Sequence, residues 1–88
     1  MKRTISDFTE LEFLEFIKAI GSADPVLYPT ERSHTNAVIE FERLSEHPLG
    51  SDLLCRPSAN GIEDSPEAML KAVKQWRAEQ GLPGFKDA

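Results

Sequence analysis

Apolar side chains near the start of the chain recur with the spacing of an amphipathic helix. The i, i+3, i+4 and i+7 positions of one helix face are filled by Phe13, Phe16, Ile17 and Ile20. Ahead of this run, Thr9 and Glu12 have the spacing of a capping box. Phe8 and Phe13 flank that cap as a hydrophobic staple. We therefore predict a helix that begins after Thr9 and ends at Gly21.

A second helical pattern follows a loop that proline defines. Pro25 and Pro29 lie in the segment 22–29, and proline removes an amide donor and disfavours helix in the residue before it. Thr30 is then a candidate N-cap with an acidic residue in the favourable first turn. Apolar residues follow at helical spacing, at Ala37, Phe41 and Leu44. These signals predict a second helix over about 31–45.

The next segment predicts only one or two turns of helix. Ser51 and Asp52 precede an apolar pair of leucines, and Pro57 closes the turn. Ser51 and Asp52 can be simple N-cap residues, a structural role that needs no function. Residues 58–64 then have the composition of a turn.

The last helix has a start signal with a geometric reason. Ser65 is an N-cap residue, and Pro66 takes the first helical position, where its missing amide costs no hydrogen bond. The apolar template is complete behind it, at Met69, Ala72, Val73 and Trp76. Gly81 suits the C-terminal cap, which leaves Leu82 and Phe85 to fold back on the core.

Together these patterns predict an all-α fold, a small four-helix bundle with a short third helix. The chain has no internal repeat and no alternating pattern of the kind that marks a strand. With 88 residues it has room for one small domain, 1–88, and too little for an enzyme with a large cleft.

Acidic residues outnumber basic ones, and they are concentrated in the middle of the chain. The sequence has 15 Asp and Glu against 10 Lys and Arg, a net charge of −5. Residues 24–64 contain eight acidic and three basic residues, so that segment alone has a net charge of −5. Because such a surface repels a phosphate backbone, we do not expect nucleic acid as a direct ligand.

Neither a cofactor, nor a metal, nor a membrane segment is indicated. Cys55 is the single cysteine, so it has no intrachain disulfide partner and no zinc ligand set. A thiol–imidazole pair of Cys55 with His34 or His47 lacks a third orienting group, so we do not expect an enzyme. The N-terminus has no apolar stretch of signal-peptide length, which favours a cytoplasmic protein.

The predicted second helix has a face that the core does not need. At about 100° per residue, an arc beside the buried stripe contains His34, Thr35, Val38 and Glu42, and Ile39 lies further round. This mixture of apolar and acidic groups suits a protein partner with apolar and basic groups. A solvated face with two isolated aliphatic residues explains the pattern equally well.

Several strings of the sequence resemble the immunity proteins of DNase-type colicins and pyocins. The most specific are EHP-x-GSDL at 46–53 and VKQWRA at 73–78. Further matching strings lie at 5–7, 9–10, 64–66 and 81–86, so the resemblance covers nearly the whole chain. Residues 29–41 most resemble the S-type pyocin members.

This resemblance implies an antidote that holds a toxic nuclease inactive in the cell that makes both. Members of the family have four helices with a short third one. They bind the nuclease domain 1:1 at an exosite beside its catalytic centre and block the access of DNA. The second helix selects the partner and the third provides shared affinity. An acidic inhibitor is drawn to the basic surface with which a nuclease binds DNA.

Transferred by position, the resemblance implies two groups of binding residues. The partner-selecting residues on the second helix are His34, Thr35, Val38, Ile39 and Glu42. The shared residues on the third are Ser51, Asp52, Cys55 and Arg56. The family usually has a pair of tyrosines at the last two positions, so this chain lacks two aromatic anchors of the kind that dominate interfaces. We expect a monomer when the protein is free.

An acyl carrier protein is the main alternative from another class. Such carriers are also small, acidic and four-helical, with a modified serine at a helix start. Here Ser51 precedes Asp52, whereas the carrier signature has the aspartate before the serine. A helical adaptor that binds a protein without silencing a nuclease is a second alternative.

Overall fold

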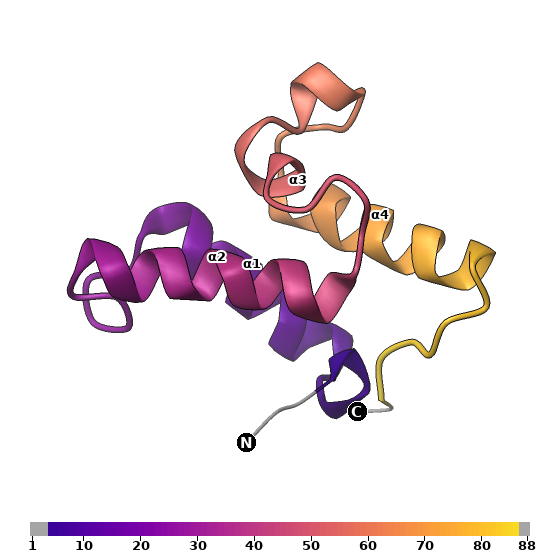
Figure 1. The fold of residues 1–88 in the computed structure, drawn as a ribbon, viewed down its shortest axis with the longest axis horizontal. Helices are drawn as coiled ribbons and strands as arrows, with labels where there is room; N and C mark the ends of the chain where they lie inside the picture. The colour runs from indigo at the N-terminus through magenta and orange to yellow at the C-terminus, as the bar shows by residue number, and fades with distance from the viewer. Residues whose placement is uncertain (1–3, 87–88) are drawn as a thin grey trace.

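The computed structural model describes residues 4–86, and its regular elements are all helical (Figure 1). The α-helices are α1 (Glu10–Ser22), α2 (Glu31–Ser45), α3 (Asp52–Cys55) and α4 (Pro66–Glu79). Two 3-10 turns, η1 (Ile5–Asp7) and η2 (Ser58–Asn60), precede α1 and follow α3. No strand occurs within this range, so the predicted all-α fold with a short third helix is confirmed.

Helix α1 packs against both α2 and α4, which makes it the centre of the fold. Figure 1 shows α3 and η2 as a projection beside one edge of α2, with η1 and residues 84–86, the two ends of the described range, on the opposite side. Two hydrogen bonds hold these ends. The Ser6 hydroxyl donates to the carbonyl of Gly84 at 2.9 Å, and the Lys86 amide donates to the carbonyl of Phe8 at 2.9 Å.

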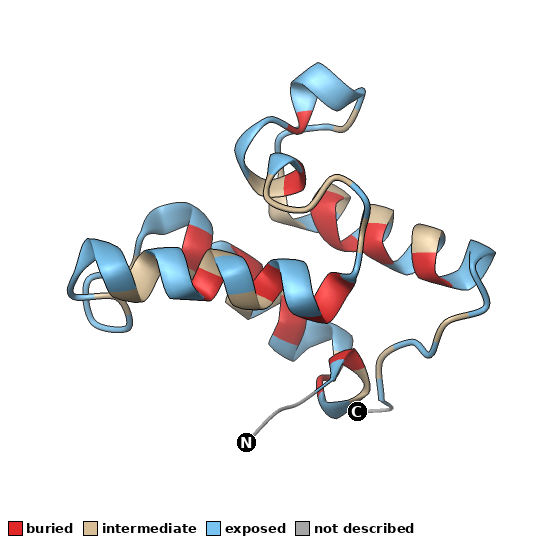
Figure 2. Cartoon of the chain, in the orientation of Figure 1, coloured by how far each residue is buried: buried red, intermediate tan, exposed pale blue. Residues whose placement is uncertain are grey.

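The core lies where α1, α2 and α4 face one another, as the buried positions in Figure 2 show. Phe13 is fully buried, and its ring stacks on Phe41 with centroids 5.7 Å apart. It also contacts Phe8 at 5.4 Å and Phe85 at 5.2 Å. The predicted staple and the predicted return of Phe85 to the core are therefore both confirmed.

The predicted helix starts are confirmed by the bonds that their caps make. The Thr9 hydroxyl accepts the amide of Glu12 at 3.1 Å, and the Glu12 carboxylate accepts the Thr9 amide at 2.9 Å. Thr30 caps α2 in the same way, through the amide three residues on. Ser65 caps α4, with Pro66 in the first turn. Each cap depends only on a side chain and an amide three residues apart, so it could be predicted from the sequence.

Gly21 does not end α1, contrary to the prediction. The helix continues to Ser22, and the residue in the left-handed conformation is Ala23, with φ 50°. The amides of Ala23 and Asp24 bond back to carbonyls in the last turn, at 3.1 Å each. This is the Schellman arrangement, which places the left-handed residue just beyond the helix. Gly21 lies two residues too early to take that place.

Exchanging these two residues is expected to stabilise the protein. A Cβ at Gly21 would meet no atom within 4 Å, so Gly21→Ala should add about 0.5–1 kcal/mol through helix propensity. Ala23→Gly removes the strain of a left-handed alanine, about 1 kcal/mol. Urea unfolding of both single variants and of the double variant measures the gain. Gly61→Ala is the control, because its φ of 75° predicts a loss. A loss of stability in either single variant would contradict the assignment.

The buried face of α4 is rotated from the predicted one. Its buried residues are Met69, Leu70, Val73 and Arg77. Ala72 and Trp76 are only partly buried, and the Trp76 ring lies against His47 with centroids 5.4 Å apart. The face is rotated because Arg77 is buried: its guanidinium donates hydrogen bonds to the carbonyls of Leu44 and Ser45 at the end of α2. The prediction that Trp76 completes the core stripe was therefore wrong.

Candidate functional site

The predicted binding residues of α2 differ in how freely they face solvent. Thr35, Ile39 and Glu42 are exposed, and the exposed fraction of Ile39 is 56%. Val38 is partly buried and packs against the core. The prediction that the core needs none of this arc is therefore wrong for Val38, because its side chain packs against the buried cluster.

His34 is held in a fixed orientation. Its Nε2 lies 2.8 Å from the carbonyl of Ile20, so Nε2 must donate, and this bond joins the start of α2 to the end of α1. The ring also meets Tyr28 edge-on, with centroids 5.8 Å apart. Burial, with the nearby Asp24 carboxylate, raises the pKa of Tyr28, so its phenol stays neutral. His34 is therefore half-buried and positioned, rather than a free surface histidine.

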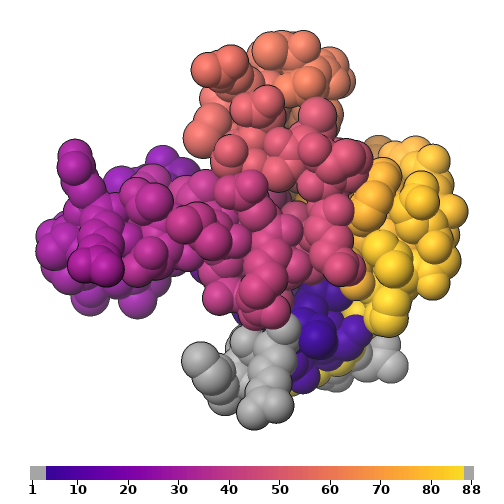
Figure 3. All heavy atoms as spheres, viewed as in Figure 1, coloured from indigo at the N-terminus to yellow at the C-terminus, as the bar shows by residue number. Residues whose placement is uncertain are grey.

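A hollow of about 570 Å³ brings residues of α2 and α3 together. His34 and Val38 line it from α2, and Leu54 and Cys55 line it from α3. Figure 3 shows it as the recess between the α1–α2 arm and the projection formed by α3 and η2. Two residue groups that are distant in the sequence thus border one concave surface.

Of the four binding residues predicted on the short helix, two lie in α3 and two flank it, and three of the four are exposed. Asp52, Cys55 and Arg56 are exposed, and Ser51 is half-buried. The Ser51 hydroxyl makes no capping bond, so the capping role suggested for it is wrong. Ser51 itself has helical backbone angles, φ −67° and ψ −21°, whereas a capping residue has an extended backbone.

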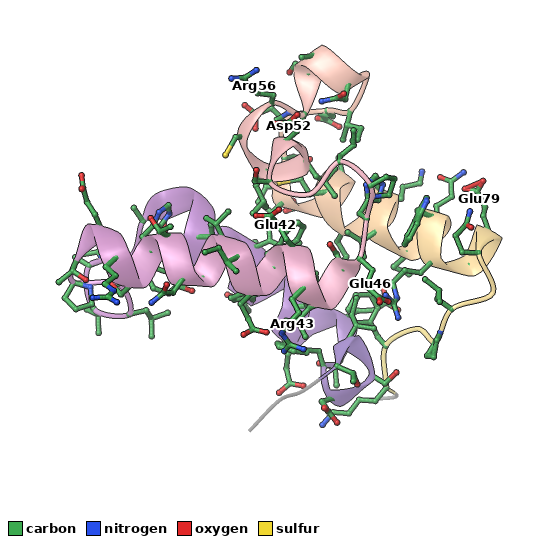
Figure 4. The ribbon with its side chains drawn as sticks, viewed as in Figure 1. Glu42, Arg43, Glu46, Asp52, Arg56 and Glu79 are labelled. Carbon is green, nitrogen blue, oxygen red and sulfur yellow. The ribbon has the colours of Figure 1, made fainter. Side chains whose placement is uncertain are left out.

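Two carboxylates mark the junction of α2 with α3. Figure 4 shows Glu42 on α2 directed toward the start of α3, where Asp52 lies. Both residues are exposed. Within residues 4–86 neither carboxylate has a cationic side chain within 4.0 Å. This junction is therefore an acidic surface without internal compensation, which suits a cationic partner.

The turn between α2 and α3 is built around His47. Its Nδ1 accepts the amide of Leu49 at 3.1 Å, and its carbonyl accepts the amide of Gly50 at 2.9 Å. His47 is therefore a turn residue whose imidazole bonds to an amide. Burial lowers the pKa of His47. Sequence reasoning did not predict the bond from the Leu49 amide to its imidazole.

Stability is expected to fall when His47 gains a proton. The folded state resists protonation, because the proton would displace the Leu49 amide, and the unfolded chain therefore binds more protons. The contribution is present above pH 6.5 and is lost as the pH falls through the lowered pKa. Urea unfolding between about pH 7.5 and about pH 5 measures it. His47→Asn is the matched control, since its side-chain oxygen can accept the same amide without titrating. Equal pH slopes for the two proteins would contradict this role.

The described residues contain neither a metal-binding cluster nor a membrane-spanning helix. No group of three His, Cys, Asp or Glu residues in this range is placed to hold a metal ion. His34 and Cys55 line the same hollow, and the bond from Nε2 of His34 to the Ile20 carbonyl fixes the ring there. None of the described helices has the length and apolar character to cross a bilayer.

Comparison with known proteins agrees with this description. The family model "colicin immunity protein / pyocin immunity protein" matches residues 5–79. The chain is 57% identical over 86 residues to the pyocin-S2 immunity protein of Pseudomonas aeruginosa strain PAO1. It is 56% identical over 86 residues to the pyocin-S1 immunity protein of Pseudomonas aeruginosa. Each alignment covers 98% of this chain and 98% of the relative.

Two solved structures have the same fold. One is the complex of the mutant nuclease domain of pyocin S8 with its cognate immunity protein, with a TM-score of 0.83 and 37% identity over 98% of this chain and 100% of that one. The other is the pyocin AP41 DNase–immunity complex, with a TM-score of 0.82 and 36% identity over 99% of this chain and 100% of that one. With fold, length and sequence in agreement, the chain belongs to the colicin and pyocin immunity protein family.

Proposed function

We propose that this protein is the immunity protein of a pyocin-type bacteriocin. It binds the nuclease domain of its cognate toxin 1:1, beside the active site, and blocks the access of DNA. It does so in the cytoplasm of the cell that produces the toxin, as an inhibitor and not as an enzyme. The observation that carries this proposal is similarity over nearly the full chain to immunity proteins, with related structures solved as complexes with nuclease or DNase domains.

The charge of the described surface supports the choice of partner. A nuclease must offer cationic groups to the phosphate backbone of its substrate. The uncompensated carboxylates of Glu42 and Asp52 are complementary to such groups, and they steer association as well as adding affinity. Binding of this acidic junction over a DNA-binding surface also repels the substrate.

The apolar part of the surface supports a protein partner rather than a small ion. Val38 and Ile39 lie on α2 next to Glu42, and the hollow between α2 and α3 adds a concave apolar wall. Cys55 stands at the rim of that hollow, where the family usually has a tyrosine. We propose that α2 selects the partner through His34, Thr35, Val38, Ile39 and Glu42. The shared contacts come from Ser51, Asp52, Cys55 and Arg56 on and beside α3.

Titration of nuclease activity tests the proposed function. Plasmid cleavage by pyocins S1 and S2 and by the nuclease domains of pyocins S8 and AP41 is measured with increasing amounts of this protein, alongside calorimetry. We expect stoichiometric inhibition of at least one member, with 1:1 binding. Absence of both binding and inhibition across this panel, extended to colicin nucleases, would overturn the proposal. A mass gain on Ser51 after treatment with a pantetheinyl transferase would favour a carrier protein instead.

Thiol labelling tests where the partner binds. Cys55 is the single cysteine and is exposed, so a maleimide reports on this one position. We expect labelling to be about ten-fold slower in the complex, because contacts at an interface exclude solvent. Equal labelling rates for the free and the bound protein would remove Cys55 from the interface, even if inhibition were observed.

A further inference from the structure

Gly50 lies unusually close to a side chain of the neighbouring helix. A Cβ atom added there would come 2.9 Å from Oε2 of Glu42, with the Glu42 Cδ and Cγ at 3.6 and 3.7 Å. A contact of 2.9 Å is closer than two such atoms tolerate, so a side chain at Gly50 and the present position of the Glu42 carboxylate exclude each other. The carboxylate rests on Gly50 because that residue has no side chain.

The backbone at Gly50 and this close approach are separate requirements. The φ angle of Gly50 is 54°, in the left-handed region that favours glycine. Gly61 and Gly81 also have positive φ, at 75° and 68°, yet an added Cβ would meet nothing within 4 Å at either. Backbone strain alone therefore does not distinguish Gly50 from the other two. What distinguishes Gly50 is the close approach of the Glu42 carboxylate.

We infer that Gly50 is a positioning residue for partner binding, because it allows the Glu42 carboxylate to lie across the junction onto the start of α3. Asp52 follows two residues later, so this glycine lets the Glu42 carboxylate lie beside the segment that leads to Asp52. Figure 4 shows the labelled Glu42 on α2 and Asp52 at the start of α3. A methyl group at Gly50 displaces the flexible end of Glu42 rather than the backbone. The inference rests on the proposed function, since it assigns a partner-binding role to this surface.

A double-mutant cycle on the complex tests this inference. Affinity for the inhibited nuclease domain is measured for Gly50→Ala, Glu42→Ala and the double variant. We expect Gly50→Ala to weaken binding about ten-fold in the presence of Glu42, and by less than about two-fold once Glu42 is truncated. Gly61→Ala is the matched control for left-handed strain, and it should leave affinity within about two-fold of wild type. Gly50→Asn tolerates positive φ better than alanine and serves as the second variant if Gly50→Ala folds poorly.

A measurement on the free protein separates this inference from the proposed function. NMR should show a contact between the Gly50 α-protons and the Glu42 side chain, and Gly50→Ala should shift the Glu42 carboxyl carbon while Gly61→Ala does not. Equal losses of affinity with and without Glu42 would overturn the inference. Absence of the NMR contact would overturn it as well. If no nuclease binds but the contact and the shift are present, the proposed function fails and the placement of Glu42 by Gly50 stands.

Discussion

Arg77→Met is expected to lower the free energy of unfolding by about 3 kcal/mol. Arg77 is 5% exposed, and its Nη1 donates to the carbonyls of Leu44 and Ser45 at 3.4 and 3.1 Å. Its Nε donates to the carbonyl of Pro83 at 2.8 Å. The last carbonyls of a helix have no partner within the helix, so Arg77 supplies donors that α2 lacks. Methionine fills much of the volume but leaves these oxygens without a donor.

The ion pair of Arg77 contributes little to this expected loss. Its Nη1 lies 3.1 Å from Oε2 of Glu46, but the Glu46 side chain is 59% exposed and solvent screens the attraction. Glu46→Gln should therefore cost less than about 0.5 kcal/mol. Arg77→Lys should lose most of what Arg77→Met loses, because one ammonium group cannot donate both to the end of α2 and to Pro83.

Urea unfolding with an exposed arginine as the control measures this effect. Arg43 lies in the last turn of α2 and pairs with Glu40, and both side chains are about half exposed. Arg43→Met removes the same charge and should cost less than about 0.5 kcal/mol. The difference between the two variants corresponds to a melting temperature lower by roughly 15 °C for Arg77→Met. A difference below about 1 kcal/mol would show that other donors, or water, replace the guanidinium.

The role of Arg77 could not be predicted from local sequence pattern. Thr9, Thr30 and Ser65 cap helices through amides three residues away, so the signal and its target lie in one short segment. The carbonyls of α2 that Arg77 binds lie more than 30 residues earlier, at the end of another helix. One signal was present: Met69, Val73 and Arg77 lie four residues apart on one helix face. Weighting apolar character alone placed Trp76 on that face instead.

The end of α1 was mispredicted for a related reason. Glycine is the usual left-handed residue after a helix, so Gly21 was the natural stop. The tertiary bond from His34 to the Ile20 carbonyl and the turn stabilised by Asp24 extend the helix past it. Ala23 then takes the strained conformation. Local propensity was outweighed by contacts that join α1 to α2.

Part of the candidate site was predictable from local spacing, and part depends on contacts between helices. Helical periodicity alone identified the arc of α2 that contains Thr35 and Glu42, because position around a helix is a property of spacing. Periodicity contains nothing about where α3 lies, so the hollow between α2 and α3 was not predictable. Neither was the contact of Gly50 with Glu42. The grouping of α2 with α3 came from family resemblance, and the structure adds the concave surface that joins them.

Glu42→Ala should weaken the complex with the cognate nuclease by about 2 kcal/mol, or roughly thirty-fold in affinity. On the proposed function, we expect partner binding to desolvate the Glu42 carboxylate against a cationic group, so that truncation leaves that cation buried without its partner. Cys55 and Arg56 stand where the family resemblance implies two aromatic anchors, so we expect charge on α2 to contribute a larger share of the affinity.

Glu79→Ala is the matched control for this effect, because it removes the same charge at the far end of α4 (Figure 4). It should change association only slightly, through the weaker long-range field, whereas Glu42→Ala should mainly speed dissociation. Competition binding at low and at physiological salt measures both variants. A loss of only a few tenths of a kcal/mol for Glu42→Ala, or equal losses for the two variants, would mean that net charge draws the partner and that the junction of α2 with α3 does not hold it.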